Sequence, residues 1–337
     1  MTLRACKRTL LLISLFVATI APPTHAEDMA FGEDGFVRLD VGKTYVNLPS
    51  ERAVITGFFL EPYGETENHL WGENIEVAGG LRLRGLDTEP EDRTRFEVAA
   101  NYLAADAKNR EAGYLLFPFG VSIPLGFFAI DGSGNANGTI LGPVNTAEFE
   151  TRYKQWGFDL KLAREVAVEG LASLTLYTGL TYFNTSLSND FDLIEDGVTI
   201  PIYLEDDIDT DYYGCMVGVD AAFPMGSELV FDVGGRLELL YADARMTAHQ
   251  NLNFFPPFNM LEVDDSDDKL AGRAQAHMGL SYALNPVVFG VGVTANYLSY
   301  QPYAEHATTV ATSNTPSHIE DDHMFGYTFN ISMNVAF

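Results

Sequence analysis

Acidic residues crowd one short stretch of this sequence. Asp206, Asp207, Asp209 and Asp211 fall within six positions, and a second acidic run follows at 264–268. Carboxylate oxygens at this density are the ligands that calcium and magnesium prefer. The spacing lacks the D-x-D-x-D-G loop and the distal glutamate of an EF-hand. The stretch therefore predicts either loosely bound divalent cations, with no other cofactor, or a solvated acidic surface.

Histidines gather near the C-terminus beside further acidic residues. The residues concerned are His306, His318 and His323, together with Glu320, Asp321 and Asp322. Imidazole and carboxylate groups in one loop would suit a transition metal. Aspartate and histidine at a rim would also suit hydrolysis, because such a pair can activate a water molecule. Either chemistry requires structural elements that bring these side chains together.

The last thirteen residues, 325–337, alternate strictly between apolar side chains and small or polar ones. The apolar positions include Tyr327, Phe329, Ile331, Met333, Val335 and Phe337. Alternation over this length predicts a β-strand with one apolar face and one polar face. The strand is about twice the usual length, and it is long enough to cross a bilayer when tilted.

Nine further segments show the same alternation, which predicts about ten strands. Their ranges are 36–45, 73–85, 94–103, 152–163, 171–183, 211–223, 228–242, 270–284 and 287–300. Short turns and long loops alternate between them; the long loops include 184–210 and 243–269. Tyrosines recur at the long-loop ends of the strands. Both features are typical of an up-and-down membrane barrel with short periplasmic turns and long extracellular loops. A two-sheet sandwich would have shorter, more evenly spaced strands.

The connection 104–151 leaves the strand number open between ten and twelve. Its segment 113–130 is strongly apolar but is interrupted by Pro118 and Pro124. This segment would form an additional hairpin, a plug inside the lumen or a lid. Proline in the middle of a strand argues against the hairpin.

The N-terminus has the pattern of a cleaved signal peptide. Arg4, Lys7 and Arg8 precede a short apolar stretch, and Thr24-His25-Ala26 forms a cleavage site. We expect residues 1–26 to be removed, 27–35 to be a short periplasmic segment, and 36–337 to form one barrel. The whole chain has 20 basic and 47 acidic residues and a net charge of −27. Such a charge excludes nucleic acid as a direct partner, because that role needs basic patches.

The signal peptide, the strand and loop pattern and the terminal strand ending in Phe337 together resemble bacterial outer-membrane β-barrel proteins. The resemblance implies an all-β fold, a closed antiparallel transmembrane barrel in the outer membrane of a Gram-negative bacterium. It also implies that the barrel-assembly machinery reads the C-terminal strand, and that outer-membrane lipid and lipopolysaccharide surround a monomeric barrel. No motif of a specific subfamily matches.

Most charged residues of the strands fall on the face opposite the apolar one. These lumen positions are Arg38, Asp40, Glu76, Arg82, Arg84, Arg95, Glu97, Asp159, Lys161, Asp220, Asp232, Arg236, Glu238, Arg273 and His277. Isolated buried charges are costly, so mixed signs in a narrow tube predict paired charges. The network would either hold and fill a small lumen or line a narrow, charge-selective channel for small solutes.

These observations predict a non-enzymatic function, either a porin-like channel or a surface structural protein with acidic extracellular loops. The alternative is a surface hydrolase similar to the omptins, which are ten-stranded barrels that use rim aspartate and histidine residues. Asp207 and Asp209 have the spacing of the omptin Asp-x-Asp motif, but they follow the fifth predicted strand. The sequence therefore predicts no catalytic residues.

Overall fold

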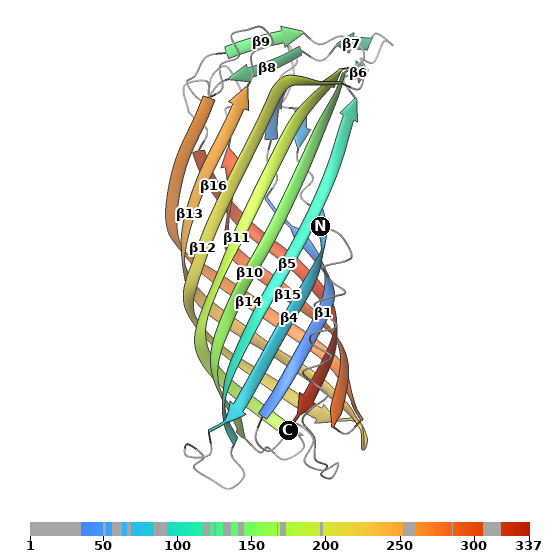
Figure 1. Cartoon of the computed structure of the whole chain (residues 1–337), viewed down its shortest axis with the longest axis vertical. Helices are drawn as coiled ribbons and strands as arrows, with labels where there is room; N and C mark the ends of the chain where they lie inside the picture. The colour runs from blue at the N-terminus through green and yellow to red at the C-terminus, as the bar shows by residue number, and fades with distance from the viewer. Residues whose placement is uncertain are drawn as a thin grey trace.

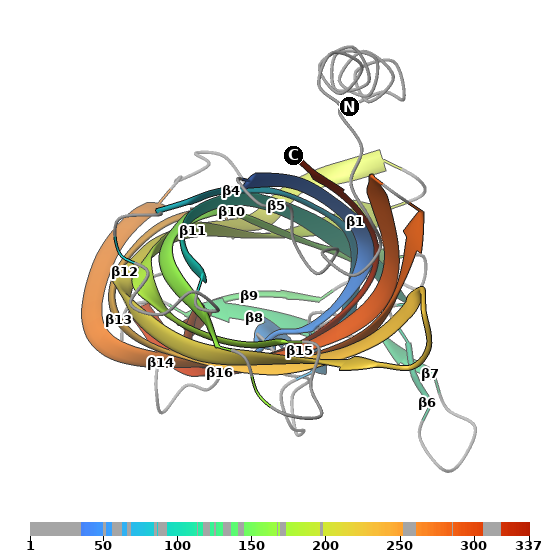
Figure 2. The same ribbon diagram turned by 90° about the horizontal axis from the view of Figure 1, so that it is seen from below.

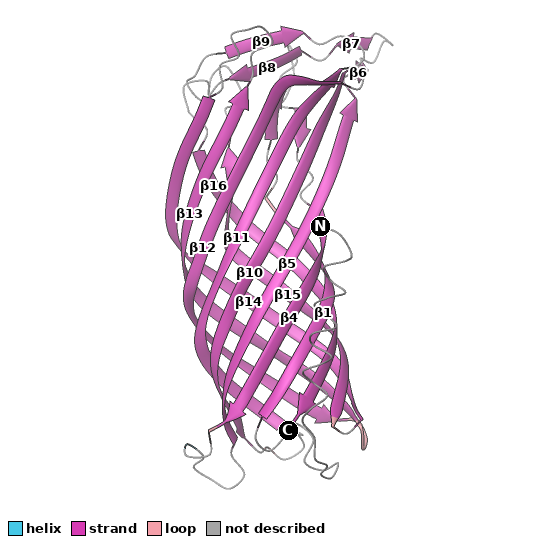
Figure 3. Ribbon diagram, viewed as in Figure 1, coloured by secondary structure: helices cyan, strands magenta, loops and turns pink. Residues whose placement is uncertain are grey.

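The computed structural model describes most of the chain beyond residue 34. The described ranges are 35–49, 52–55, 63–65, 69–83, 86, 93–112, 114–116, 122–124, 126–130, 136–140, 145–166, 168, 173–195, 198–251, 261–284, 286–305 and 318–337. Nearly all of these residues are β-strand (Figure 3). Within them, no helix has the length and apolar character needed to span a bilayer. The predicted signal peptide, Arg84 and His306 lie outside these ranges.

Ten strands close into one antiparallel barrel (Figure 1, Figure 2). They are β1 (Gly35–Asn47), β4 (His69–Arg82), β5 (Arg93–Ala112), β10 (Asn145–Val166), β11 (Ser173–Glu195), β12 (Val198–Pro224), β13 (Leu229–Asn251), β14 (Leu261–Leu284), β15 (Val287–Glu305) and β16 (His318–Ala336). The last strand, β16, pairs with β1. The terminal residue extends this pairing, because Phe337 and Gly35 exchange two backbone hydrogen bonds of 3.0 Å. The prediction of an all-β, closed barrel of ten strands is confirmed.

Six short strands lie outside this barrel in three two-stranded sheets. They are β2 (Arg52–Ile55) with β3 (Tyr63–Glu65), β6 (Tyr114–Leu116) with β7 (Ser122–Pro124), and β8 (Gly126–Ile130) with β9 (Ala136–Ile140). Figure 1 shows β6 to β9 beyond the end of the barrel opposite the C-terminus. The segment 113–130 therefore adds no strand to the barrel, and the twelve-stranded alternative is wrong.

Several predicted loops are largely strand. The predicted loop 184–210 is almost entirely β11 and β12, with only residues 196–197 between them, and β13 and β14 cover much of 243–269. The 27 residues of β12 extend for about 90 Å at about 3.3 Å per residue. A tilted strand crosses a bilayer with only about 9–11 residues. The barrel therefore continues well beyond the membrane on its outer side.

The polarity of the alternation reverses along the strands, as β13 shows. In its first half, Leu237 faces outward and is 63% exposed, while Glu238 faces the lumen and is buried. Beyond Tyr241, the outward side chains are polar, as with Arg245, and the lumen side chains are apolar, as with Met246. One half of the barrel thus has an apolar exterior and a charged lumen. The other half has a polar exterior and a lumen in which apolar side chains predominate, with polar exceptions such as Asp206 and Thr210.

A ring of aromatic side chains marks the height at which the polarity reverses. Its members are Tyr45, Trp71, Tyr102, Trp156, Tyr182, Tyr213, Tyr241, Tyr297 and Tyr327. Neighbouring rings touch, with 5.3 Å between the centroids of Trp156 and Tyr182. Such belts lie at membrane interfaces. From Tyr213 to Phe223 at the other rim there are about eleven residues, the length of one tilted crossing. The ring therefore marks the outer surface of the membrane.

The position of the membrane can be tested with an outward leucine on β13. We expect Leu237→Arg to lower the free energy of unfolding by about 2–4 kcal/mol, because an arginine on the lipid face near the middle of the span is poorly solvated. The matched control, Thr247→Arg, lies on the exterior of the same strand above the aromatic ring, between Asp207 and Asp264, and should change the free energy of unfolding by less than about 0.5 kcal/mol. Urea unfolding of protein refolded into lipid vesicles measures both. Equal effects would mean that the apolar band does not face lipid.

Candidate functional site in the barrel lumen

Charged side chains from three strands form a continuous chain of ion pairs across the lumen. Asp159 on β10 pairs with Arg236 on β13 at 2.5 Å, and Arg236 pairs with Glu238 at 2.7 Å. Arg273 on β14 donates from two nitrogens to the two oxygens of Glu238, at 2.7 and 2.8 Å. The side chain of Glu238 has no exposed surface. We call these four residues the ion-pair chain.

Other predicted lumen residues pair around this chain. Arg38 contacts Asp40 at 2.8 Å and Glu76 at 2.6 Å. His277 lies 3.7 Å from Asp220, and Lys161 lies 3.9 Å from Asp159. The hydroxyl of Ser281 donates to Asp232 at 3.3 Å. Arg82 lies opposite Arg95 in the register of β4 and β5.

The sequence reasoning missed two members of the lumen network. Arg95 lies 3.3 Å from the predicted Glu97 but also 3.0 Å from Glu165. Glu165 lies beyond the predicted end of its strand. It is nevertheless an even number of positions from Asp159 and Lys161, and therefore shares their face of the strand. The hydroxyl of Thr181 donates to Asp159 at 2.7 Å. In the sequence, only the inward position of Thr181 indicated that it could contact Asp159, because threonine carries no charge.

A buried apolar cluster fills the lumen on the outer side of the ion-pair chain. All ten barrel strands contribute to it; the members are Val46, Leu48, Leu70, Ala105, Tyr153, Phe183, Leu187, Ile208, Tyr212, Leu240, Ala242, Ala244, Met246, Ala271, Leu298, Tyr300, Ala304, Ile319 and Met324. Tyr153, Phe183 and Tyr212 are 0–1% exposed. Side chains around a water-filled passage would keep accessible surface. We call this cluster the apolar layer, and no open passage runs beside its buried rings in the part of the chain that the structure describes.

Contacts within the apolar layer reach across the lumen. The hydroxyl of Tyr212 on β12 donates to the backbone carbonyl of Tyr300 on β15 at 3.0 Å, although these strands are not neighbours in the barrel. Burial raises the pKa of Tyr212 well above its ordinary value, so this hydroxyl stays protonated and remains a donor. The rings of Tyr212 and Phe183 stack with centroids 4.5 Å apart. The layer is thus held by both packing and a hydrogen bond.

Arg273 joins the two parts of the lumen. Its guanidinium lies 4.1 Å from the ring centroid of Phe183, in addition to its paired contact with Glu238. A cation over an aromatic face is attracted by the ring, more strongly when water is excluded. The apolar layer therefore rests directly on the ion-pair chain, without a solvated gap between Arg273 and Phe183.

The predicted acidic metal ligands do not share one side of the barrel. Asp206 faces the lumen and is 1% exposed, whereas Asp207, Asp209 and Asp211 face outward along β12. Asp211 accepts hydrogen bonds from Tyr182 at 2.6 Å and from Asn184 at 3.1 Å. These aspartates are separated because they lie in a strand, where adjacent side chains point to opposite faces. A loop would not impose this separation.

Comparison with known proteins finds only remote similarity between structures. No protein-family model and no curated protein matches the sequence. The chain is similar to a Pseudomonas aeruginosa FadL homologue, with 9% identity, a TM-score of 0.34 and coverage of 90% of this chain and 91% of that one. It is also similar to the translocator domain of the autotransporter NalP from Neisseria meningitidis, with 9% identity, a TM-score of 0.35 and coverage of 99% and 95%.

A third structure, the toluene transporter TbuX of Ralstonia pickettii, has 8% identity, a TM-score of 0.31 and coverage of 91% and 90%. At these values the likeness carries no assignment of function. The assignment to a class rests on three features of the chain itself. These are the closure of ten strands, the apolar exterior bounded by aromatic side chains, and the charged side chains inside it. The chain is an integral outer-membrane β-barrel protein.

Proposed function

We propose that this protein is a non-enzymatic structural barrel with a closed lumen, which holds an acidic β-barrel above the membrane surface. The apolar layer carries this proposal. An ion that crossed it would have to leave water among side chains such as Tyr212 and Leu240, which are at most 1% exposed. Apolar constrictions block ion flow by excluding water, and a closely packed layer does so more strongly.

The ion-pair chain also supports a structural role. Charges that select ions must be free to bind the passing ion in place of its water. In this lumen, both oxygens of Glu238 are occupied by Arg273, and Arg236 adds a third contact. The buried charges of this chain are thus paired with one another, which favours holding the barrel together over guiding a solute.

The exterior above the aromatic ring supports a role at the cell surface. Outward positions of β12 and β14 there are largely acidic, as at Asp207, Asp209, Asp264 and Asp268. Lipopolysaccharide phosphates carry the same sign of charge, so contact between the two surfaces requires divalent cations between them. We propose that loosely bound divalent cations link these carboxylates to neighbouring lipopolysaccharide.

Conductance in a planar bilayer tests the closed lumen. We expect the refolded protein to insert without producing steady single-channel current, because ions cannot cross the apolar layer. Protection of the membrane-spanning strands from added protease shows that the protein has inserted. A steady current from the intact protein would overturn the proposal and favour the porin-like channel.

A further inference from the structure

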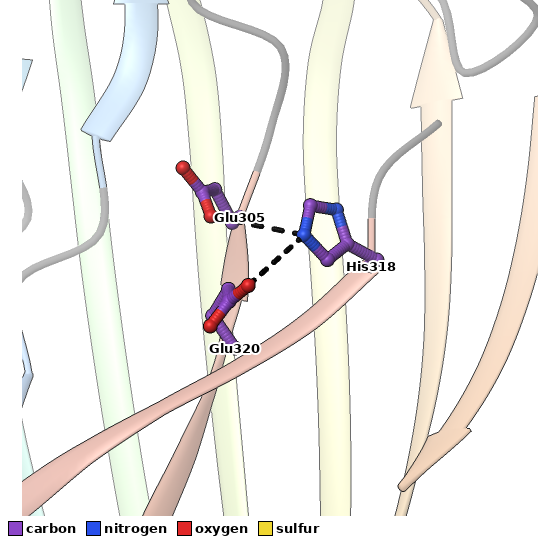
Figure 4. Close-up of side chains that lie close together, drawn as sticks. All are labelled: Glu305, His318 and Glu320. Atoms are coloured by element: carbon purple, nitrogen blue, oxygen red, sulfur yellow. Dashed lines mark hydrogen bonds and ion pairs between the residues drawn. The ribbon is translucent and has the colours of Figure 1, made fainter. Parts of the chain in front are cut away.

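Three side chains able to bind a metal lie together on the barrel exterior, at the outer ends of β15 and β16 (Figure 4). Glu305 is the last residue of β15, and its direct cross-strand partner is His318, the first residue of β16. Glu320 follows two positions along β16 and so shares the face of His318. The intervening Ile319 and the neighbouring Ala304 face the lumen and are buried. The register of the sheet therefore places three donors on one outward patch.

The distances between the donor atoms fit ligands of a single ion. Nε2 of His318 lies 3.3 Å from Oε1 of Glu320 and 3.7 Å from Oε2 of Glu305. One donor atom from each residue lies within 4.8 Å of the other two. Two ligands of a tetrahedral zinc ion, each bound at about 2.0–2.2 Å, are about 3.4 Å apart. Small side-chain rotations would bring the three donors onto one ion without moving the strands.

Hydrogen bonding alone does not account for this arrangement. Figure 4 shows that Nε2 of His318 is the atom that approaches both carboxylates. One ring nitrogen has at most one proton to donate, and 3.7 Å is too long for a hydrogen bond. A hydrogen bond from this nitrogen can therefore pair with only one of the two carboxylates. A cation between the three groups would satisfy both carboxylates and the imidazole together.

We propose that Glu305, His318 and Glu320 bind a first-row divalent transition metal, with zinc as the representative ion and water in the remaining positions. A nitrogen ligand beside two oxygens favours such an ion over calcium or magnesium, which take oxygen ligands. The side chains are 51%, 34% and 45% exposed, so an ion can enter from solvent. The site would link β15 to β16 at their last cross-strand pair. It is independent of the closed lumen.

Zinc titration of untagged protein, refolded in detergent and stripped with a chelator, tests the site by calorimetry. We expect one saturable site per chain. Loss of a supporting group outside the ligand shell already weakens metal sites about tenfold or more, so His318→Gln or Glu305→Gln should weaken zinc binding at least that much. Zinc should also raise the unfolding temperature of the parent protein and leave that of His318→Gln unchanged. Circular dichroism confirms that each variant forms the barrel.

The matched control is His323→Gln on the same strand. His323 is exposed and contacts only one carboxylate among the described residues, Asp322 at 2.6 Å. Zinc binding should be unchanged in this variant. The proposal fails if the parent protein shows no saturable zinc binding, or if His323→Gln weakens binding as much as His318→Gln does. It also fails if calcium binds the same site as tightly, which would indicate a general acidic surface.

Discussion

Glu238→Gln is expected to destabilise the barrel by about 3–5 kcal/mol, because removing one partner from a buried charge pair leaves the other charge uncompensated. Glu238 is the shared partner of Arg236 and Arg273, and its side chain has no exposed surface. Arg236 keeps Asp159 in the variant, whereas Arg273 loses its acidic partner. Glutamine has nearly the shape of glutamate, so packing changes little and the effect reports the lost charge.

The matched control for Glu238 is an ion pair in solvent. Asp243 and Arg245 lie 3.1 Å apart on the exterior of β13 above the aromatic ring, with side chains that are 34% and 74% exposed. Exposed pairs contribute about 0–1 kcal/mol, so Asp243→Asn should be close to neutral. Urea unfolding of each refolded protein gives the free-energy difference. If Glu238→Gln costs no more than Asp243→Asn, the ion-pair chain does not hold the barrel together, and its charges would be free to act on a solute.

The membrane-spanning half of the barrel could be predicted because lipid imposes a strict pattern. A strand in the membrane must face lipid with every second residue, and no edge can stay open. Arg236 and Glu238 are two positions apart, so a shared face followed directly from the sequence. Which residues of other strands they contact could not be predicted in this way. Asp159 lies on β10, which is not a neighbour of β13, so its contact with Arg236 depends on how the whole sheet curves around the lumen.

The outer half was missed because its pattern is inverted. Above the aromatic ring, Asp207 and Asp209 take the outward positions that apolar residues occupy within the membrane, and they were interpreted as a loop. The alternation itself continues, with Ile208 facing the lumen between them. A search for alternation of either polarity would have found these strands. Glu305 was missed for a different reason, since only the hairpin register places it opposite His318.

The double change Phe183→Ala, Tyr212→Ala is expected to turn a silent barrel into a conducting one. These stacked rings are 0–1% exposed and lie directly above Arg273, so their removal lets water reach the ion-pair chain from the outer side. Each truncation of a large buried side chain costs about 3–5 kcal/mol, and the hydrogen bond to Tyr300 is also lost. Protease protection must therefore show that the variant has folded before its current is interpreted.

The control for this opening lies on the same strand. Leu180 on β11 faces lipid and is 62% exposed, so Leu180→Ala should leave the barrel silent. Current from the double variant but not from Leu180→Ala would place the barrier to ions in the apolar layer. A folded double variant that stays silent would instead assign the barrier to the ion-pair chain, whose charged groups are already paired and cannot bind a passing ion. In that case Glu238→Gln, combined with the double change, is the variant in which current should first appear.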